Sequence, residues 1–579
     1  MEGKNQLLGQ EDGRAIRAKQ RLYWYHRLAV ALVAILFLRS TWSFFAPSPH
    51  HHSVEEAIRR YDGESIEWKL CATNNGHDLE CASIDVPMDH FNAATSGDKT
   101  FSIPLIRLRG SKATRNLLVN PGGPGGSGVE FVFRLGGFVK SIVGDDLHIV
   151  GFDPRGINGS RPEALCYPDA MTRMQRSQIC VSDHSQFDPE LYSWTENFVQ
   201  ACADTTGAEH IKYVNTPQTA ADMNSILDAL GQDAMVYWGF SYGTVLGQTY
   251  ASMFPERSER VVIDGVVNLF DWYEEMITLE GLVDAEKALT GFFDKCMKEG
   301  EACPLAHLAE DAAKLEDKVM AAVNALKENP ADVYLSNTDY GSLIYGTMLS
   351  AIWTTLLKPA EWYVLADSLA QLVQGNATDA FERYGLKGYF VPEFFDHNAI
   401  VANNDHITGK DNWPQKGELV KWFQPFLNAS IFSTGAAREF YLASQWRLPT
   451  THSFKPSRRV ATKHPLLILS QTYDPATPLV SARLARDTFE GSRLVECLGV
   501  GHCTTAIHSA CSAKLVREFL VDGTLPEEDV QCKVDGKYFI PLEEKEKIML
   551  RGASDGASDE ERLWAAQLGL SNGLTPPRF

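Results

Sequence analysis

Short apolar runs alternate with turn residues and helix-like stretches through most of this chain. The clearest runs cover residues 116–120, 148–152, 235–239, 261–263, 466–469 and 492–498, and each ends at or just before Gly, Pro, Asp or Ser. Runs that are apolar throughout are typical of strands covered on both faces. The pattern therefore predicts a mostly parallel central sheet with helices on both faces. Ligands of such sheets bind at the carboxyl ends of the strands, so the residues that follow the runs are the candidates for chemistry.

A long helical stretch interrupts this pattern. From residue 271 the apolar positions follow helical spacing, as at 306–326, and sheet-like runs return only at Pro465. We expect a first core segment at 66–270, an inserted helical cap domain at 271–454, a second core segment at 455–547 and a polar tail at 548–579.

The N-terminus carries a different signal. Residues 28–38 are apolar without interruption, and the arm 1–27 before them contains Lys4, Arg14, Arg17, Lys19, Arg21 and Arg27. The segment 28–45 is interpreted either as a cleaved signal peptide or as a single-pass membrane anchor, and 46–65 as a linker. Both interpretations place the rest of the chain in the secretory lumen or outside the cell, because the basic side stays cytoplasmic.

Composition narrows the partners. A net charge of −20 over 579 residues opposes binding to nucleic acid, which requires clustered Lys and Arg. None of the eleven cysteines forms a CxxC pair, so no zinc site is expected, and the close pairs Cys71/Cys81 and Cys296/Cys303 predict local disulfides. Sequons at Asn158, Asn376 and Asn428 would accept glycans in an exported chain. The oligomeric state is left open.

One serine lies where a nucleophile is expected. Ser241 is the centre of Gly239-Phe-Ser-Tyr-Gly243, which follows the run 235–238 and precedes a helix-like stretch at 244–250. A serine on such a strand-to-helix turn exposes its hydroxyl beside the positive end of the helix. We therefore predict that Ser241 is a catalytic nucleophile, the alternative being a structural turn serine.

A glycine-rich loop is the candidate oxyanion hole. The sequence Asn120-Pro-Gly-Gly-Pro-Gly-Gly-Ser-Gly128 follows the run 116–120, and it lacks the Lys and the following Ser or Thr that a phosphate loop requires. Backbone N–H groups of Gly123 and of Tyr242, the residue after the serine, are predicted to stabilise a developing oxyanion.

An acid and a histidine follow the serine in the order that this architecture requires. Asp474 comes after the run 466–469, and His502 comes after the run 492–498. His502 is predicted to take the proton of Ser241, and Asp474 to orient and stabilise the resulting imidazolium. Asp153 and Arg155 are interpreted as a structural pair that shapes the pocket floor, with substrate contact as the alternative.

Together these motifs resemble the prolyl iminopeptidase and tripeptidyl aminopeptidase family. Cys511, Gly523-Thr-Leu-Pro526 and Cys532 resemble the C-terminal part of the tripeptidyl aminopeptidase branch. The resemblance implies an α/β-hydrolase fold, a Ser241, Asp474 and His502 triad, no metal, and release of short pieces from peptide N-termini. Pro121 stands where prolyl iminopeptidases often carry a histidine, so their proline specificity is not transferred.

The leading functional hypothesis is a serine exopeptidase that needs no cofactor or metal and acts through an acyl-enzyme on Ser241. Glu274, Glu275 and Glu280 are candidates to bind a substrate ammonium group, but the favoured interpretation of each is a residue on a solvated helical face. The main alternative is an esterase, lactonase or amidase acting on a small acyl substrate, and a third is a binding protein that has lost catalysis.

Overall fold

The computed structural model describes residues 63–177, 187–205, 208–385 and 394–573. The basic arm 1–27, the apolar segment 28–45 and all but the end of the linker 46–65 lie outside the described residues. None of the helices within the described ranges combines the length and the apolar character that a membrane crossing requires.

The predicted central sheet is confirmed and is larger than the apolar runs indicate. Its ten strands lie in the order β1-β2-β3-β5-β4-β6-β7-β10-β11-β12. In this order every neighbouring pair from β5 onward is parallel. Their bounds are β1 (Lys69–Asn74), β2 (His77–Pro87), β3 (Thr100–Leu108), β4 (Arg115–Asn120), β5 (Leu147–Phe152), β6 (Met235–Phe240), β7 (Ser258–Asp264), β10 (Leu467–Tyr473), β11 (Arg493–Val500) and β12 (Val530–Cys532). β1 to β3 form an antiparallel extension, which the sequence pattern did not predict.

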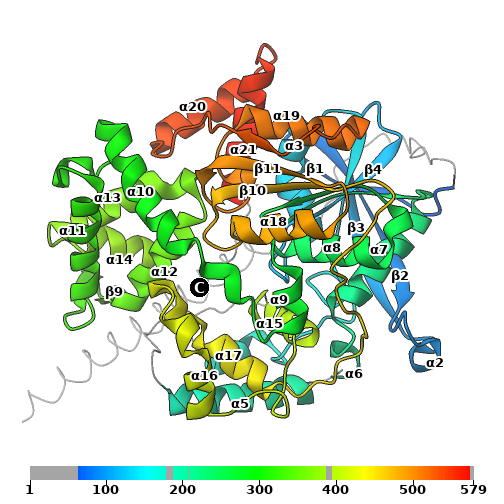
Figure 1. Ribbon diagram of the computed structural model, residues 1–579, viewed down its shortest axis with the longest axis horizontal. Helices are drawn as coiled ribbons and strands as arrows, with labels where there is room; N and C mark the ends of the chain where they lie inside the picture. The colour runs from blue at the N-terminus through cyan, green and yellow to red at the C-terminus, as the bar shows by residue number, and fades with distance from the viewer. Residues whose placement is uncertain (1–62, 178–186, 206–207, 386–393, 574–579) are drawn as a thin grey trace, which may run out of the picture. The chain divides into compact units, whose positions relative to one another are not determined.

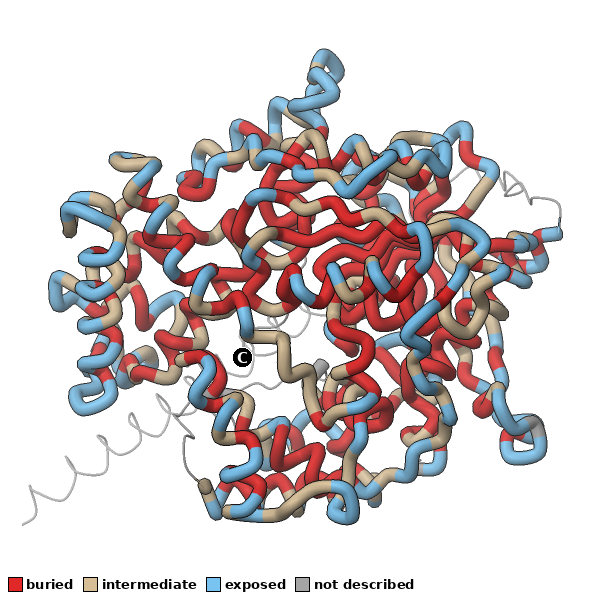
Figure 2. Tube along the Cα trace, in the orientation of Figure 1, coloured by how far each residue is buried: buried red, intermediate tan, exposed pale blue. Residues whose placement is uncertain are grey.

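Helices cover both faces of this sheet (Figure 1). One face carries α3 (Gly128–Val143), α19 (Ala510–Asp522) and α21 (Asp559–Gly573), and the other carries α7 (Thr216–Ala229), α8 (Tyr242–Met253) and α18 (Leu479–Thr488). The centre of the sheet is buried between these layers (Figure 2), and every residue of β5 and β6 is buried. Double coverage explains why the central strands are apolar at successive positions rather than at alternate ones.

The predicted insertion between β7 and β10 is helical. Its helices are α9 (Leu269–Glu274), α10 (Ala285–Glu299), α11 (Ala312–Ala325), α12 (Tyr345–Leu356), α13 (Trp362–Val373), α14 (Thr378–Tyr384), α15 (Phe394–Asp405), α16 (Gly417–Leu427) and α17 (Ala437–Gln445). The helix expected over 306–326 begins later, because Asp311 caps it by accepting from Lys314 N–H at 2.9 Å. The hairpin of β8 (Ala331–Ser336) and β9 (Asp339–Leu343) was not predicted.

A segment assigned to the core joins this insertion. Helix α5 (Pro189–Asp204) comes between β5 and β6 in the chain, yet its Leu191 and Tyr192 pack in one apolar cluster with Phe423 and Tyr441 of the insertion. The rings of Tyr192 and Tyr441 meet edge to face with centroids 5.4 Å apart. We call α5 and α9 to α17 together the helical cap, which is therefore built from two separate stretches of chain.

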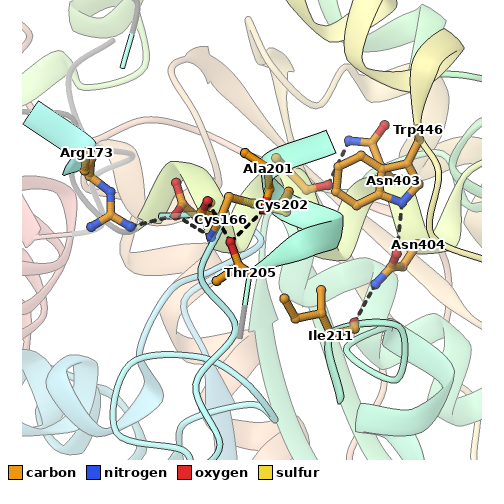
Figure 3. Close-up of a disulfide and its surroundings, with 11 residues drawn as sticks. Cys166, Arg173, Ala201, Cys202, Thr205, Ile211, Asn403, Asn404 and Trp446 are labelled. Atoms are coloured by element: carbon orange, nitrogen blue, oxygen red, sulfur yellow. Dashed lines mark hydrogen bonds and ion pairs between the residues drawn. A yellow bond between two sulfur atoms is a disulfide. The ribbon is translucent and has the colours of Figure 1, made fainter. Parts of the chain in front are cut away.

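A disulfide fixes the entry to α5. Cys166 in the preceding loop is bonded to Cys202 near the end of α5, and Thr205 Oγ1 donates to the Cys166 carbonyl oxygen at 3.1 Å (Figure 3). Asp396 of α15 accepts from Cys166 N–H at 2.9 Å and from Arg173 at 2.6 Å. Cys166 and the short helix α4 (Ala170–Arg176), which carries Arg173, are thus tied to two helices of the cap, α5 and α15.

The expected polar tail from residue 548 is wrong for most of its length. This region contains the end of α20 (Leu542–Gly552) and all of α21, and Leu563, Ala566 and Leu570 are buried against α3 and the sheet. These three positions repeat at helical spacing and form one apolar stripe. From Leu563 to Ser571 every residue except Trp564 is buried, and Ala565 and Leu568 pack in a second apolar cluster with Ile548 of α20. Most of the exposed polar residues lie before and at the start of α21.

Four disulfides occur among the described residues. Cys71–Cys81 and Cys296–Cys303 confirm the two local pairs that the spacing predicted, and Cys166–Cys202 and Cys511–Cys532 are the others. Cys497 and Cys503 are buried free thiols, and Cys180 lies outside the described residues. Several disulfides in one chain are typical of proteins that fold in an oxidising compartment.

Candidate active site

Ser241 lies on the sharp turn from β6 to α8. Its φ of 56° and ψ of −124° are unusual for a residue with a side chain. Ser241 N–H donates to the Asp264 carbonyl oxygen at 3.0 Å, which fixes the turn from outside. The flanking glycines are required by space, because a Cβ at Gly239 would lie 2.4 Å from the Gly243 carbonyl oxygen. Such strain at a serine is a recurring feature of functional sites.

The glycine-rich loop after β4 lies directly against this turn. Gly122 has a φ of 92°, and a Cβ there would lie 2.9 Å from Ser241 Cβ and 3.1 Å from the Tyr242 backbone nitrogen. Gly123 and Tyr242, the two predicted oxyanion donors, line the same cavity as Ser241. The backbone of the loop therefore approaches the serine as closely as a residue without a side chain allows.

Asp474 and His502 come together from two neighbouring strands. Asp474 follows β10 and His502 follows β11, and His502 Nδ1 lies 3.0 Å from each carboxylate oxygen of Asp474. Asp474 also accepts from the N–H groups of Ala476, Thr477 and Cys503, each at 2.9 Å, and from the Thr477 hydroxyl at 2.8 Å. The carboxylate is fully buried, whereas 12% of the His502 side chain remains exposed.

Electrostatics favour an ionised acid and a basic histidine. Burial opposes ionisation of Asp474, but the neighbouring His502 and the hydrogen bonds that it accepts hold its pKa below the ordinary value of 3.8. Burial likewise opposes protonation of His502, but the charge of Asp474, with a contribution from Asp264, raises the pKa of His502 above its ordinary value of 6.5. The imidazolium that a general base forms is stabilised here.

This shift predicts the pH dependence of the free enzyme. A protonated His502 cannot accept the proton of Ser241, so kcat/KM is expected to fall as the pH decreases through the raised pKa of His502. The midpoint of this acidic limb should lie above 6.5, the ordinary pKa of histidine. The measurement is kcat/KM against pH for one substrate from about pH 5 to about pH 9. A profile that stays flat down to pH 5 would exclude His502 as the general base.

A cavity of about 450 Å³ opens onto Ser241 and His502. Most of its wall belongs to the helical cap and is apolar or aromatic, including Trp272, Leu349, Trp353, Phe426 and Phe432. The charged residues on the described part of its wall are Arg438 and Glu439, both at the start of α17. A cavity of this size and character is typical of sites that enclose a small ligand or a few residues of a peptide.

Several residues singled out in the sequence lie away from this cavity. Asp153 and Arg155 do not pair with each other: Asp153 accepts from the Ser127 hydroxyl at 2.5 Å, whereas Arg155 pairs with Asp222 at 2.6 Å. Neither lines the cavity, so the predicted pair is replaced by two separate structural contacts.

The three acidic candidates of the cap are also elsewhere. Glu274 pairs with Arg458 on the surface, Glu280 accepts from Asn268 and from Ser481, and neither these two nor Glu275 lines the cavity. Among the described residues, Glu439 is the acidic one on the wall, and the sequence did not predict it. Its neighbours Ala437 and Phe440 follow ordinary amphipathic spacing, so no sequence signal distinguishes it from a surface glutamate.

Comparison with known proteins agrees with this geometry. Residues 115–356 match the family described as alpha/beta hydrolase fold, and residues 429–532 match the family of TAP-like proteins. The chain is 28% identical over 543 residues to serine protease Hip1 of Mycobacterium tuberculosis, which covers 89% of this chain and 98% of that protein. It is 26% identical over 496 residues to tripeptidyl aminopeptidase of Streptomyces lividans, covering 82% and 88%. Carboxylesterase B of M. tuberculosis is 27% identical over 486 residues, covering 80% and 89%.

Proposed function

We propose that this chain, which matches the α/β-hydrolase and TAP-like families, is a serine exopeptidase that releases short peptides or single residues from peptide N-termini. Serine hydrolase chemistry follows from the family. The observation that carries the exopeptidase proposal is the cavity over Ser241, on whose wall Glu439 is the one acidic side chain among the described residues.

We infer the following roles for the site. Ser241 Oγ attacks the substrate carbonyl carbon while His502 Nε2 takes its proton, and the backbone N–H groups of Gly123 and Tyr242 stabilise the oxyanion. His502 then gives the proton to the leaving amine, which leaves an acyl-enzyme on Ser241. A water molecule, activated by the same histidine, releases the acyl group. Asp474 stays ionised throughout and holds the His502 tautomer.

The cavity wall supports recognition of a free amino terminus. The Glu439 side chain is exposed on the cavity wall, with Arg438 as the adjacent charged residue. Within the described ranges Glu439 makes no ion pair or hydrogen bond with another side chain, and Asn403 Oδ1 on the same wall is a buried acceptor without a partner. Each of these oxygens is an acceptor for the N–H groups of a substrate ammonium. Glu439 and Ser241 line the same cavity of about 450 Å³, which has room for only a few residues of a peptide between them.

The experiment compares substrates that differ only at the N-terminus. Peptide anilides with a free amino terminus, the same peptides acetylated, and simple aryl esters are tested with the wild type and with Glu439→Gln. Loss of a charge-assisted hydrogen bond, about 1.5–3 kcal/mol, should lower kcat/KM for free peptides roughly 10- to 100-fold. Acetylated peptides and esters should change little, because they lack the ammonium group.

Glu418→Gln is the matched control, since Glu418 lies in the neighbouring helix α16, pairs with Lys421 and does not line the cavity. Efficient turnover of esters without turnover of any peptide would reject the exopeptidase proposal in favour of a small acyl substrate. Equal rates on free and acetylated peptides, unaffected by Glu439→Gln, would show an endopeptidase-like site.

We also propose that the catalytic part of the chain lies in the secretory pathway or outside the cell, as a secreted or a singly anchored protein. The four disulfides support this placement. Asn376 and Asn428 are exposed, so both sequons are accessible to glycosylation. Sequencing the N-terminus of the mature protein distinguishes a cleaved signal from an anchor, and a chain found reduced in the cytosol would overturn the placement.

A further inference from the structure

We propose that Asp264 is a positioning residue of the active site: a second buried carboxylate that ties the Ser241 turn to the His502 loop and places its negative charge beside His502. Asp264 is the last residue of β7 and has no exposed surface. β7 lies between β6, which leads to Ser241, and β10, which leads to Asp474. The inference rests on the proposed function, because it concerns how the same triad is assembled.

The backbone of Asp264 supports the nucleophile. Its carbonyl oxygen accepts from Ser241 N–H at 3.0 Å, so the strained turn is anchored to the end of β7. The next residue, Gly265, has a φ of 71°, and a Cβ there would lie 2.5 Å from Cys503 Sγ. The end of β7 therefore packs without free space between the serine turn and the residue after the histidine.

The side chain of Asp264 holds the loop that carries His502. One carboxylate oxygen accepts from Thr504 N–H at 2.6 Å, and the other accepts from the Thr504 hydroxyl at 2.7 Å. Between Thr504 and His502 stands Cys503, whose φ of 64° is again unusual for a residue with a side chain. Hydrogen bonds hold this conformation from both sides. Asp474 accepts from Cys503 N–H, and Asp264 accepts from Thr504, the next residue.

The charge of Asp264 also acts on His502. Burial raises the pKa of Asp264 to about 6, against the hydrogen bonds from Thr504. The titratable groups that face it are Asp474 after β10, His502 and Cys503 after β11, and Cys497 within β11. Of these, His502 is the group that becomes cationic, so an ionised Asp264 stabilises the imidazolium together with Asp474.

Hydrogen bonding alone does not account for a carboxylate at this position. An asparagine would also accept from Thr504 N–H, and its amide could donate to the Thr504 hydroxyl, without the cost of burying a charge. The charge is useful only if a cation forms nearby. That difference separates a positioning role in catalysis from a structural one.

The experiment uses the full chain and three variants, Asp264→Asn, Asp264→Ala and Thr504→Val. The substrate is the one that the wild type turns over best, and rates are divided by the concentration of active sites, titrated with a fluorophosphonate that labels the reactive serine. Asp529→Asn is the matched control, because Asp529 accepts from Leu494 N–H at the opposite end of β11. The readouts are kcat, KM and the acidic limb of kcat/KM.

We expect Asp264→Ala to lower kcat per active site by about 10- to 100-fold with KM little changed, since small misplacements of reacting groups have effects of this size. Asp264→Asn should restore most of this kcat but move the acidic limb to lower pH, because His502 loses a neighbouring negative charge. Thr504→Val should lower kcat less than Asp264→Ala and leave the acidic limb in place. The control should match the wild type in all readouts.

An Asp264→Asn variant with the wild-type acidic limb would overturn the charge contribution, and Thr504→Val and Asp264→Ala with wild-type kcat would overturn the positioning. If Asp264→Ala fails to fold, the other two variants still decide, because both keep the side-chain volume. Ser241→Ala is run beside them. If it is as active as the wild type, the proposed function fails, whereas an inactive Ser241→Ala beside unaffected Asp264 variants rejects this inference alone.

Discussion

Replacing Ser241 with alanine is expected to lower kcat by about 10⁴- to 10⁶-fold, the range observed when the nucleophile of a serine hydrolase is removed. The variant loses only the hydroxyl oxygen. The backbone contacts of the turn, Ser241 N–H to the Asp264 carbonyl oxygen and Thr244 N–H to the Ser241 carbonyl oxygen, are unaffected. The melting temperature should therefore stay near that of the wild type, and the loss should appear in kcat rather than in substrate binding.

The measurement is kcat on the preferred substrate, together with labelling by a fluorophosphonate probe, which should be abolished. Ser252→Ala is the control: Ser252 lies in the same helix, α8, and its hydroxyl donates to the Gln248 carbonyl oxygen. It should label and react like the wild type. Retained labelling in Ser241→Ala would place the nucleophile on another residue.

The second large effect is expected for Asp474→Asn, which should lower kcat by about 10⁴-fold. The asparagine amide group would face His502 and favour the tautomer that cannot accept the serine proton. Cys503 N–H and the Thr477 hydroxyl both donate to Asp474 Oδ2 in the wild type. An amide nitrogen at that position cannot accept from them, so these donors would lose their acceptor. A buried donor left without an acceptor costs about 1–3 kcal/mol, so the melting temperature should fall as well.

Asp487→Asn serves as its control, because Asp487 lies on the exposed side of α18 and pairs only with the adjacent Arg486 among the described ion pairs. Rates per titrated active site separate the loss of catalysis from a loss of folded protein. Should Asp474→Asn keep a wild-type kcat per site, the acid of the triad would have to be sought elsewhere, with Asp264 as the first candidate.

The sequence predicts the sheet well where strands are covered on both faces. The apolar run at 235–239 and the following Gly-x-Ser-x-Gly predict both β6 and the turn at Ser241. The run is apolar throughout because the strand is covered on both faces, and the two glycines are needed because the sharp turn leaves no space for side chains. Asp474 and His502 were found by their order and by their places at strand ends. Their 3.0 Å contact could not be read from the sequence, but it follows once β10 and β11 are neighbours.

The residues that were missed lack such a local cause. Asp264 ends a strand that was predicted, but many aspartates end strands, and only the packing of β7 between β6 and β10 brings it to Thr504. Glu439 lines the cavity only through the packing of α17 against α5 and α15. Helix α5 was assigned to the core because it lies between two core strands in the chain, although its apolar face matches the cap. In each case the decisive partner is distant in sequence.

The packing of α21 against α3 has a consequence for how the protein is made. Helix α3 leaves the ribosome early, but Leu135 and its neighbours stay uncovered on that side until Leu563 and Leu570 have been synthesised. The first half of the sheet therefore spends most of translation with an exposed apolar surface, the condition in which nascent chains aggregate or recruit chaperones. The α3 side of the sheet is fully covered only after α21, the last described helix, has emerged. The yield of folded protein during synthesis should therefore depend on α21, which is the helix most distant in sequence from the first strands.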